Sequence, residues 1–172
     1  MVTIVVPHRT RDGKRRLALD GGIHEAVVEA MLRDVLEACR AFGPTVVADW
    51  PGGQGAAVAL ALAQVEGQVL VVNSDLPCAT ADDLAALLAA VPESGLALVE
   101  ARDGTTNALA LDKAQLFAPV YGVGSAARFR ALAPSRTLEL RNLVDDVDTP
   151  DDLRRLAGRL GRHTQAAMAL AA

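Results

Sequence analysis

Apolar and polar residues follow one another along this chain in two kinds of pattern. Short uninterrupted apolar runs are typical of strands covered on both faces, and apolar residues spaced three or four positions apart are typical of amphipathic helices. The two patterns alternate along the chain, which favours one three-layer α/β/α domain around a mixed, mostly parallel sheet. The predicted strands cover residues 3–6, 45–49, 69–72, 96–100, 107–111 and 138–140, and the predicted helices cover residues 23–42, 56–65, 80–91, 126–132 and 150–160.

Local signals mark several ends of these elements. Gly43-Pro44 predicts the end of the first long helix. Thr80, which is followed closely by two aspartates, and Thr149, followed by a proline, are predicted N-caps. Residues 161–172 are rich in alanine and either continue as a helix or fray. We see no repeat and no linker, so residues 1–172 are predicted to form a single domain.

Composition and charge narrow the range of partners. The 172 residues carry a net charge of −4, which argues against a nucleic-acid backbone as partner, because phosphate binding needs a basic face. No apolar run approaches the roughly 20 residues of a membrane span, and residues 1–7 lack the pattern of a signal peptide. Cys39 and Cys78 are far apart and are predicted to be reduced, structural thiols. These observations favour a cytoplasmic protein that binds neither nucleic acid nor membrane.

The stretch after the strand at residues 69–72 carries the first candidate for chemistry. Asn73, Ser74 and Asp75 precede Leu76-Pro77, and proline cannot continue a central strand because it has no N–H for the ladder. The strand therefore ends with Asp75 at its carboxyl end, the edge where open α/β sheets bind their ligands. The alternative is that Asp75 only caps the following turn.

A second acidic group, Asp145, Asp146 and Asp148, precedes the last predicted helix. In a strand, residues 146 and 148 point to one side and residue 145 to the other, so Asp146 and Asp148 are placed to meet Asp75. Carboxylate oxygens of this kind suit Mg²⁺, which proteins hold with one or two carboxylates plus substrate phosphates. The alternative is that Asp148 only precedes a helix and that Asp145 faces solvent.

Three loops are candidates for binding anions. The loop after the first strand carries five basic residues between positions 9 and 16, and it either holds phosphates or is a solvated basic loop. His8, in the same stretch, is either a ligand or a bystander. Residues 50–55 are rich in glycine and either let a nucleotide approach closely or serve as a hinge. Residues 117–125 form a second glycine loop, where Ser125 starts a helix and offers an anion site.

Four motifs of the chain carry a resemblance to a known family. They are Asn73-Ser74-Asp75-Leu76-Pro77, Asp103-Gly104-Thr105-Thr106-Asn107-Ala108-Leu109, Tyr121-Gly122-Val123-Gly124-Ser125 and Asp146-Val147-Asp148-Thr149-Pro150-Asp151-Asp152-Leu153. Together they resemble the 2-phospho-L-lactate or phosphoenolpyruvate guanylyltransferase family, which makes a GDP-linked precursor of the deazaflavin coenzyme F-420. The similarity covers residue 3 to about residue 157. It implies the nucleotide-diphospho-sugar transferase fold, shared with the molybdenum-cofactor guanylyltransferases, and transfer of GMP from GTP to a small phospho-acid.

The resemblance also implies roles for individual residues. The implied Mg²⁺ ligands are Asp75, Asp146 and Asp148, and the implied catalytic residues are Lys14, Arg16 and Asp75. The implied phospho-acid site consists of Thr106, Asn107, Gly122, Gly124 and Ser125. The implied nucleotide site consists of Pro7, Lys14, Gly53, Gln54 and Gly55.

The chain departs from the family pattern in three places. Gln54 stands near the usual position of an asparagine, and Phe129 stands where the family has a histidine. The segment from residue 44 to residue 55 is also shorter than the corresponding segment of typical members. Two other functions therefore stay open. One is another nucleotidyltransferase of the same fold, acting on a molybdopterin or a sugar phosphate, and the other is a non-catalytic nucleotide-binding or interaction protein. The retained carboxylates favour catalysis, because a degenerate copy has no physical need for them.

Overall fold

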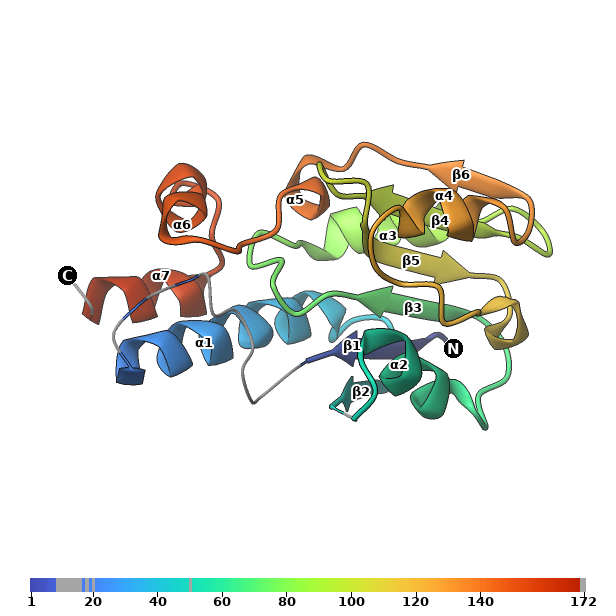
Figure 1. Cartoon of the computed structure of the whole chain (residues 1–172), viewed down its shortest axis with the longest axis horizontal. Coiled ribbons are helices and arrows are strands. Elements are labelled where there is room, and N and C mark those ends of the chain that lie inside the picture. Colours follow the sequence, from blue (N-terminus) through green and yellow to red (C-terminus); the bar gives the residue numbers. More distant parts are fainter. Residues whose placement is uncertain (9–16, 18, 20, 50, 171–172) are drawn as a thin grey trace.

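A six-stranded sheet runs through the computed structural model, which describes residues 1–8, 17, 19, 21–49 and 51–170 (Figure 1). Its strand order is β2-β1-β3-β5-β4-β6. The strands are β1 (Thr3–Pro7), β2 (Thr45–Ala48), β3 (Val69–Val72), β4 (Leu96–Glu100), β5 (Thr106–Leu111) and β6 (Ser135–Thr137). The first five lie within one residue of their predicted bounds, because each is a largely apolar run with clear breaks on either side.

One strand runs against the other five. β1 pairs in parallel with β2 and β3, and β4 pairs in parallel with β6, whereas β5 is antiparallel to its neighbours β3 and β4. The sheet is therefore mixed and mostly parallel, as predicted. Val72 at the end of β3 pairs with Ala108 near the start of β5. The start of β5, with Thr106, consequently lies at the same edge as the end of β3.

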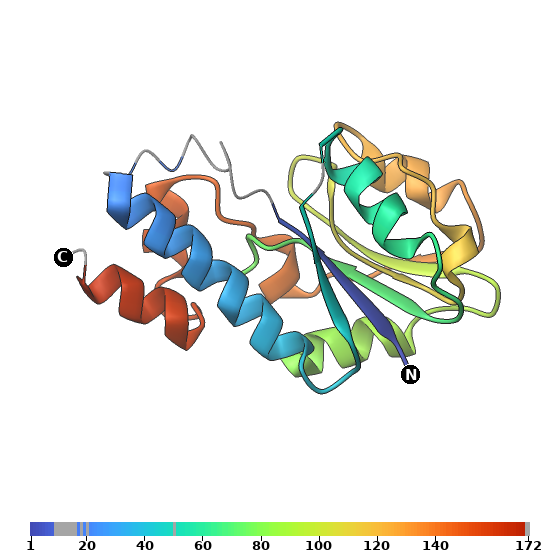
Figure 2. The ribbon, with the colours of Figure 1, turned by 90° about the horizontal axis from the view of Figure 1, so that it is seen from below.

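Helices cover both faces of the sheet (Figure 2). One apolar core joins the sheet to α1 (Gly21–Cys39), α3 (Ala81–Ala89) and α5 (Arg141–Val144). A second core joins it to α2 (Gln54–Leu62) and α4 (Ser125–Arg130). Alternate residues of β3 belong to the two cores, as the two faces of a strand require. The predicted three layers are confirmed.

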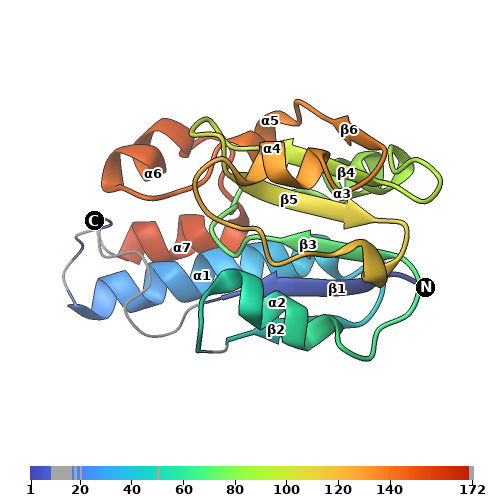
Figure 3. The same cartoon turned by 45° about the vertical axis from the view of Figure 1, so that its right-hand side comes forward.

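A third apolar cluster lies beyond the sheet and contains residues of α1, α6 (Pro150–Leu156) and α7 (Arg162–Leu170) (Figure 3). Cys78, which follows β3, and Val147 are buried in this cluster. The cluster therefore borders the carboxyl end of β3. Of the two alternatives for residues 161–172, the structure shows a helix as far as Leu170.

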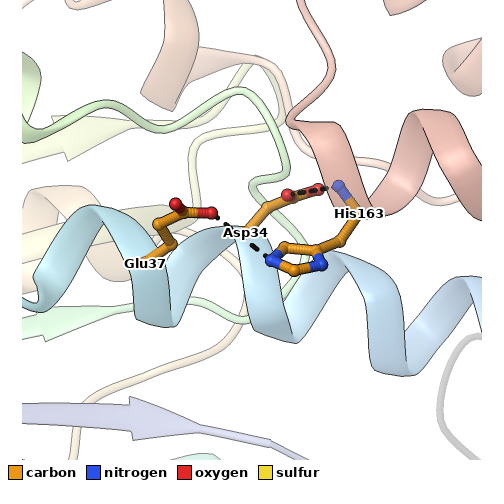
Figure 4. Close-up of side chains that lie close together, drawn as sticks. All are labelled: Asp34, Glu37 and His163. Atoms are coloured by element: carbon orange, nitrogen blue, oxygen red, sulfur yellow. Dashed lines mark hydrogen bonds and ion pairs between the residues drawn. The ribbon is translucent and has the colours of Figure 1, made fainter.

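A residue of α1 caps the start of α7. Both carboxylate oxygens of Asp34 are used, since one accepts from the backbone N–H of His163 at 2.9 Å and the other from the N–H and hydroxyl of Thr164 at 2.9 and 2.6 Å. His163 also lies beside Glu37, with Nε2 3.3 Å from Oε2 (Figure 4). A Cβ on Gly161 would overlap the Asp34 carboxylate, so this close approach requires glycine. Asp34 thus joins α1 to the start of α7.

The predicted strand at residues 138–140 is wrong. The strand β6 lies three residues earlier, and two of its three residues are exposed. A polar edge strand has no apolar pattern, whereas Leu138 and Leu140 are apolar because they pack against the core that contains α1 and α3. The helix α5 that follows is absent from the prediction, since four residues are too few to show helical periodicity.

Two further predictions are confirmed, namely the threonine N-caps and the free, buried cysteines. Thr80 and Thr149 cap α3 and α6, each in a capping box with an aspartate three positions later. Cys39 and Cys78 are free and buried. No described helix reaches the length and apolar content that a membrane crossing demands. The last predicted helix is too long, because α6 ends at Leu156.

Candidate active site

Three carboxylates from distant parts of the sequence meet where β3 ends. The candidate ligand oxygens of Asp75, Asp146 and Asp148 lie within 4.8 Å of one another. The backbone N–H of Val147 donates to the Asp75 carbonyl over 3.0 Å, which joins the two segments that carry these carboxylates. The structure thus brings together the three residues that the sequence suggested as Mg²⁺ ligands.

This donor set fits a hard divalent cation. It contains carboxylates alone, and all three residues are partly buried. Mg²⁺ prefers such oxygen ligands, and it keeps coordination positions for water and substrate phosphates. A site of three carboxylates at the carboxyl end of a strand is therefore suited to a metal that is shared with a phosphorylated substrate.

Asp145 is separate from this group, although it directly precedes Asp146. Its side chain is 3% exposed and accepts hydrogen bonds from Arg159 (2.7 Å), Arg102 (2.8 Å) and Arg155 (3.0 Å). Burial by itself raises the pKa of Asp145, but the three arginines outweigh burial and lower this pKa to about 2. The alternative in which Asp145 faces solvent is wrong.

The segment 145–148 is not a strand, contrary to the expectation from its alternation. Its first and third residues are nevertheless buried, and its second and fourth are partly exposed, so the alternation holds without a sheet partner. The capping box of α6 fixes its end, because the Asp152 carboxylate accepts from the N–H groups of Asp148 (3.2 Å) and Thr149 (2.9 Å). Burial raises the pKa of Asp152, but hydrogen bonds led by those from Arg155 and Thr149 lower it to about 2.

The start of β5 lies next to the end of β3 and reaches α4. Thr106 Oγ1 is 3.0 Å from Ser125 Oγ, and both side chains are buried. The amide of Asn73, two residues before Asp75, donates to the Thr106 carbonyl over 3.2 Å. Asn107 points to the opposite face, toward α5. Of the predicted phospho-acid ligands, Thr106 and Ser125 therefore lie together, and Asn107 does not join them.

Arg128 shapes the glycine loop before α4 and is absent from the predicted site. Its guanidinium donates to the carbonyls of Val123 (2.7 Å), Val120 (3.0 Å) and Tyr121 (3.3 Å). Gly122 and Gly124 of this loop have φ values of +108° and +70°, which residues other than glycine rarely adopt. In a planar trans peptide the carbonyl and the following N–H point in opposite directions. The N–H groups after these three carbonyls therefore point away from Arg128. Arg128 could have been found from its position in the sequence, three residues after Ser125.

The predicted nucleotide residues are only partly described. Pro7 is the last residue of β1 and lies at the carboxyl edge of the sheet. His8 follows it and is buried, with Nδ1 3.1 Å from Ser74 Oγ, and burial lowers the pKa of this histidine. Lys14 and Arg16 lie outside the described residues.

The start of α2, which includes the last two residues of the predicted glycine-rich loop, contacts the loop before α4. Gly53 precedes α2 with a φ of +92°, and Gln54 Nε2 donates to Asn73 Oδ1 over 2.6 Å. A Cβ on Gly55 would lie 3.0 Å from the Pro119 carbonyl oxygen, closer than ordinary packing allows. The loops predicted to bind the nucleotide and the phospho-acid are therefore packed against each other.

Similarity to known proteins identifies the family. A family model described as the MobA-like NTP transferase domain matches residues 15–148. The chain belongs to the MobA-like NTP transferase family. A phosphoenolpyruvate guanylyltransferase of Sphaerobacter thermophilus is 49% identical over 96 residues, which cover 52% of this chain and 46% of that protein. The chain thus spans about half the length of this relative.

Two further proteins extend the similarity over most of the chain. A 2-phospho-L-lactate guanylyltransferase of Methanosphaerula palustris is 30% identical over 170 residues, which cover 87% of this chain and 80% of that protein. The structure of a 2-C-methyl-D-erythritol 4-phosphate cytidylyltransferase from Thermus thermophilus matches with a TM-score of 0.61 and 18% identity, over 88% of this chain and 95% of that chain. The resemblance drawn from the four motifs and the predicted nucleotidyltransferase fold are both confirmed.

Proposed function

We propose that this protein is a guanylyltransferase that transfers GMP from GTP to the phosphate of phosphoenolpyruvate or 2-phospho-L-lactate and releases pyrophosphate, in coenzyme F-420 biosynthesis. The observation that carries the proposal is the meeting of Asp75, Asp146 and Asp148 within 4.8 Å at the sheet edge where β5 begins. Family membership supports the reaction type, and the names of the two relatives support the substrates.

The reaction brings together two anions that repel each other. An oxygen of the substrate phosphate attacks the α-phosphorus of GTP, and the bond between this phosphorus and the pyrophosphate oxygen breaks. The protein forms no covalent intermediate, so it acts by positioning and by charge stabilisation. Mg²⁺, held by Asp75, Asp146 and Asp148, would supply positive charge to the phosphates.

The phospho-acid is assigned to the loop before α4 and the start of β5. Thr106, Gly122, Gly124 and Ser125 are the proposed contacts. Arg128 donates hydrogen bonds to three loop carbonyls, and this supports the assignment. The N–H groups that follow these carbonyls point away from the guanidinium. Backbone N–H groups arranged in this way favour carboxylate and phosphate oxygens.

The nucleotide is assigned to the basic loop after β1 and to the start of α2, which packs against the loop before α4. Lys14 and Arg16 would contact the triphosphate, because paired cations stabilise phosphate oxygens by charge-assisted hydrogen bonds. Pro7, Gly53, Gln54 and Gly55 would lie near the base and ribose. The two buried free thiols are compatible with the cytoplasm as the place of the reaction.

The direct test follows pyrophosphate release from GTP and Mg²⁺ with the purified chain. The acceptors are phosphoenolpyruvate, 2-phospho-L-lactate, 3-phospho-D-glycerate and a sugar phosphate, and CTP replaces GTP in a parallel series. We expect release with GTP and one of the first two acceptors. Release with the sugar phosphate alone would support another nucleotidyltransferase of this fold. No release with any acceptor would overturn the proposal.

The phospho-acid assignment is tested separately with two arginine variants of α4. Arg128→Met removes the donor to the loop carbonyls. Arg130→Met is the control, because it removes an arginine of the same helix that forms an ion pair with Glu100 instead. We expect Arg128→Met to raise the KM for the phospho-acid about tenfold at an unchanged KM for GTP, because the loop loses the charged hydrogen bonds that orient its N–H groups. Arg130→Met should change neither. Equal increases in both KM values for Arg128→Met would count against this loop as the phospho-acid site.

A further inference from the structure

We propose that Asn107 and Asp145 are positioning residues, which hold the segment 145–148 so that Asp146 and Asp148 meet Asp75. This inference rests on the metal site of the proposed function. Neither residue belongs to the carboxylate group itself. Asn107 bonds to the end of α5, where the segment begins, and Asp145 fixes the first residue of the segment to three arginines.

Asn107 caps the end of α5 from the neighbouring strand. Its side chain is 2% exposed, and Nδ2 donates to the carbonyls of Leu143 (3.0 Å) and Val144 (3.2 Å). A helix of four residues cannot satisfy its own last carbonyls, so these two need an outside donor. Since α5 ends at Val144, this cap fixes the point from which the acidic segment begins.

Asp145 anchors the segment on the side opposite to the metal site. The three arginines that bond to it come from different places, with Arg102 just after β4, Arg155 in α6 and Arg159 just after α6. A buried carboxylate with three charge-assisted bonds has one well-defined position. Neighbouring residues of an extended segment point to opposite sides, so fixing Asp145 also sets the direction of Asp146.

Such anchors matter because the acidic segment belongs to neither the sheet nor a helix. Mg²⁺ requires its ligands in nearly fixed geometry, and a loop that moves freely would bind it weakly. A direct contact between Asn107 and the phospho-acid is the competing role. The geometry favours positioning, because the Asn107 amide faces α5 while Thr106, the adjacent residue, faces Ser125.

The test measures the affinity of the full chain for Mn²⁺ alone, by electron paramagnetic resonance of the free ion. Asn107→Leu removes the amide donor at similar side-chain size, and Asp145→Asn removes the charge at the same shape. We expect each variant to raise the Kd for Mn²⁺ about tenfold or more, the usual effect of losing a partner that orients metal ligands. The Mg²⁺ concentration for half-maximal turnover should rise in proportion, while the KM for the phospho-acid changes less than about twofold.

Thr164→Val is the matched control, because it also removes one buried hydrogen bond, at the start of α7. It should lower the resistance to urea and leave the Mn²⁺ affinity as in the wild type. Arg102→Met is a second variant for the case that Asn107→Leu does not fold. The Arg102 side chain is 72% exposed, so its loss spares the core and removes one bond to Asp145. A severalfold weaker Mn²⁺ affinity is expected.

Three results would overturn the positioning role. They are a wild-type Mn²⁺ affinity in the Asn107 and Asp145 variants, an equal loss of affinity in Thr164→Val, and a raised KM for the phospho-acid as the main effect of Asn107→Leu. The Mn²⁺ measurement needs no substrate. Failure of the proposed function, seen as no pyrophosphate release with any acceptor, is therefore distinguished from failure of the positioning role. A wild-type protein that binds no Mn²⁺ would overturn the metal site and the positioning role together.

Discussion

Two groups of side chains in this protein look alike and have different surroundings. Each group brings three candidate ligand atoms within 4.8 Å of one another. The helix-junction group, between α1 and α7, consists of Asp34, Glu37 and His163, and the sheet-edge group, at the end of β3, consists of Asp75, Asp146 and Asp148. Spacing alone does not tell which of them is a metal site.

The tasks of the carboxylates separate the two groups. Asp34 uses both oxygens to cap α7, and Glu37 bonds to Arg162 and His163 of the same helix. The helix-junction group therefore holds two helices together. The sheet-edge group lies at the edge where open α/β sheets bind ligands, next to the glycine loops. Carboxylates close together therefore indicate a metal site only when their place in the fold and their other bonds are consistent with one.

The largest expected effect separates the groups by activity. Asp75→Asn should lower Mg²⁺-dependent turnover by about 10³-fold. A bound metal contributes several kcal/mol by stabilising the negative charge of the transition state for nucleotidyl transfer. Circular dichroism should show an intact fold, since the residue follows a strand. Asp34→Asn, from the helix-junction group, is the control and should retain turnover when folded. Wild-type turnover in Asp75→Asn would remove the metal assignment.

The second effect is on stability and concerns the helix-junction group. Asp34→Ala leaves two N–H groups and one hydroxyl at the start of α7 without their acceptor, so the free energy of unfolding should fall by about 2–3 kcal/mol. Urea denaturation measures this change, and hydrogen exchange should show the loss in α7 first. The affinity for Mn²⁺ should stay at the wild-type value. Weaker Mn²⁺ binding with unchanged stability would reverse the roles of the two groups.

The third effect is the acid sensitivity of the scaffold around the sheet-edge group. The pKa of Asp145 is about 2 in the folded protein against an ordinary value of 3.8, so the unfolded chain takes up a proton first as the pH falls. The stabilisation is present above about pH 4 and is lost between about pH 4 and pH 2, by about 2 kcal/mol for this residue. Urea midpoints at pH 5, 3.5 and 2.5 measure it. Asp145→Asn should show a shallower decline, and a decline as steep as in the wild type would contradict the assignment.

The smallest effect tests the packing at the helix junction. Gly161→Ala places a methyl group against the Asp34 carboxylate and should lower the free energy of unfolding by about 1–2 kcal/mol. Gly158→Ala is the matched control, since nothing lies within 4 Å of its Cβ position and its φ is ordinary. It should be nearly neutral. Equal urea midpoints for the two variants would show that α7 does not depend on this close contact.

Local signals explain which elements could be predicted. The apolar runs of β1, β3 and β4 and the capping boxes at Thr80 and Thr149 depend only on neighbours in sequence, and all were found. β6 and α5 were missed for the same reason, because a polar edge strand and a four-residue helix leave no periodic pattern. The strand end, the alternation of residues 145–148 and the family motifs all point to Asp75, Asp146 and Asp148, whereas Arg128 belongs to no recognised motif.

The sequence by itself determined the alternation of strands and helices, the family and the residues with the chemistry of metal and phosphate binding. Tertiary structure alone decided which of these residues meet. Because β5 is antiparallel to β3, Thr106 lies at the edge where β3 ends. Asp145 bonds to three arginines, so it lies apart from the carboxylate group that contains Asp146 and Asp148. Periodicity and caps are local, but contacts between residues far apart in the sequence depend on strand order and helix packing, which no local pattern contains.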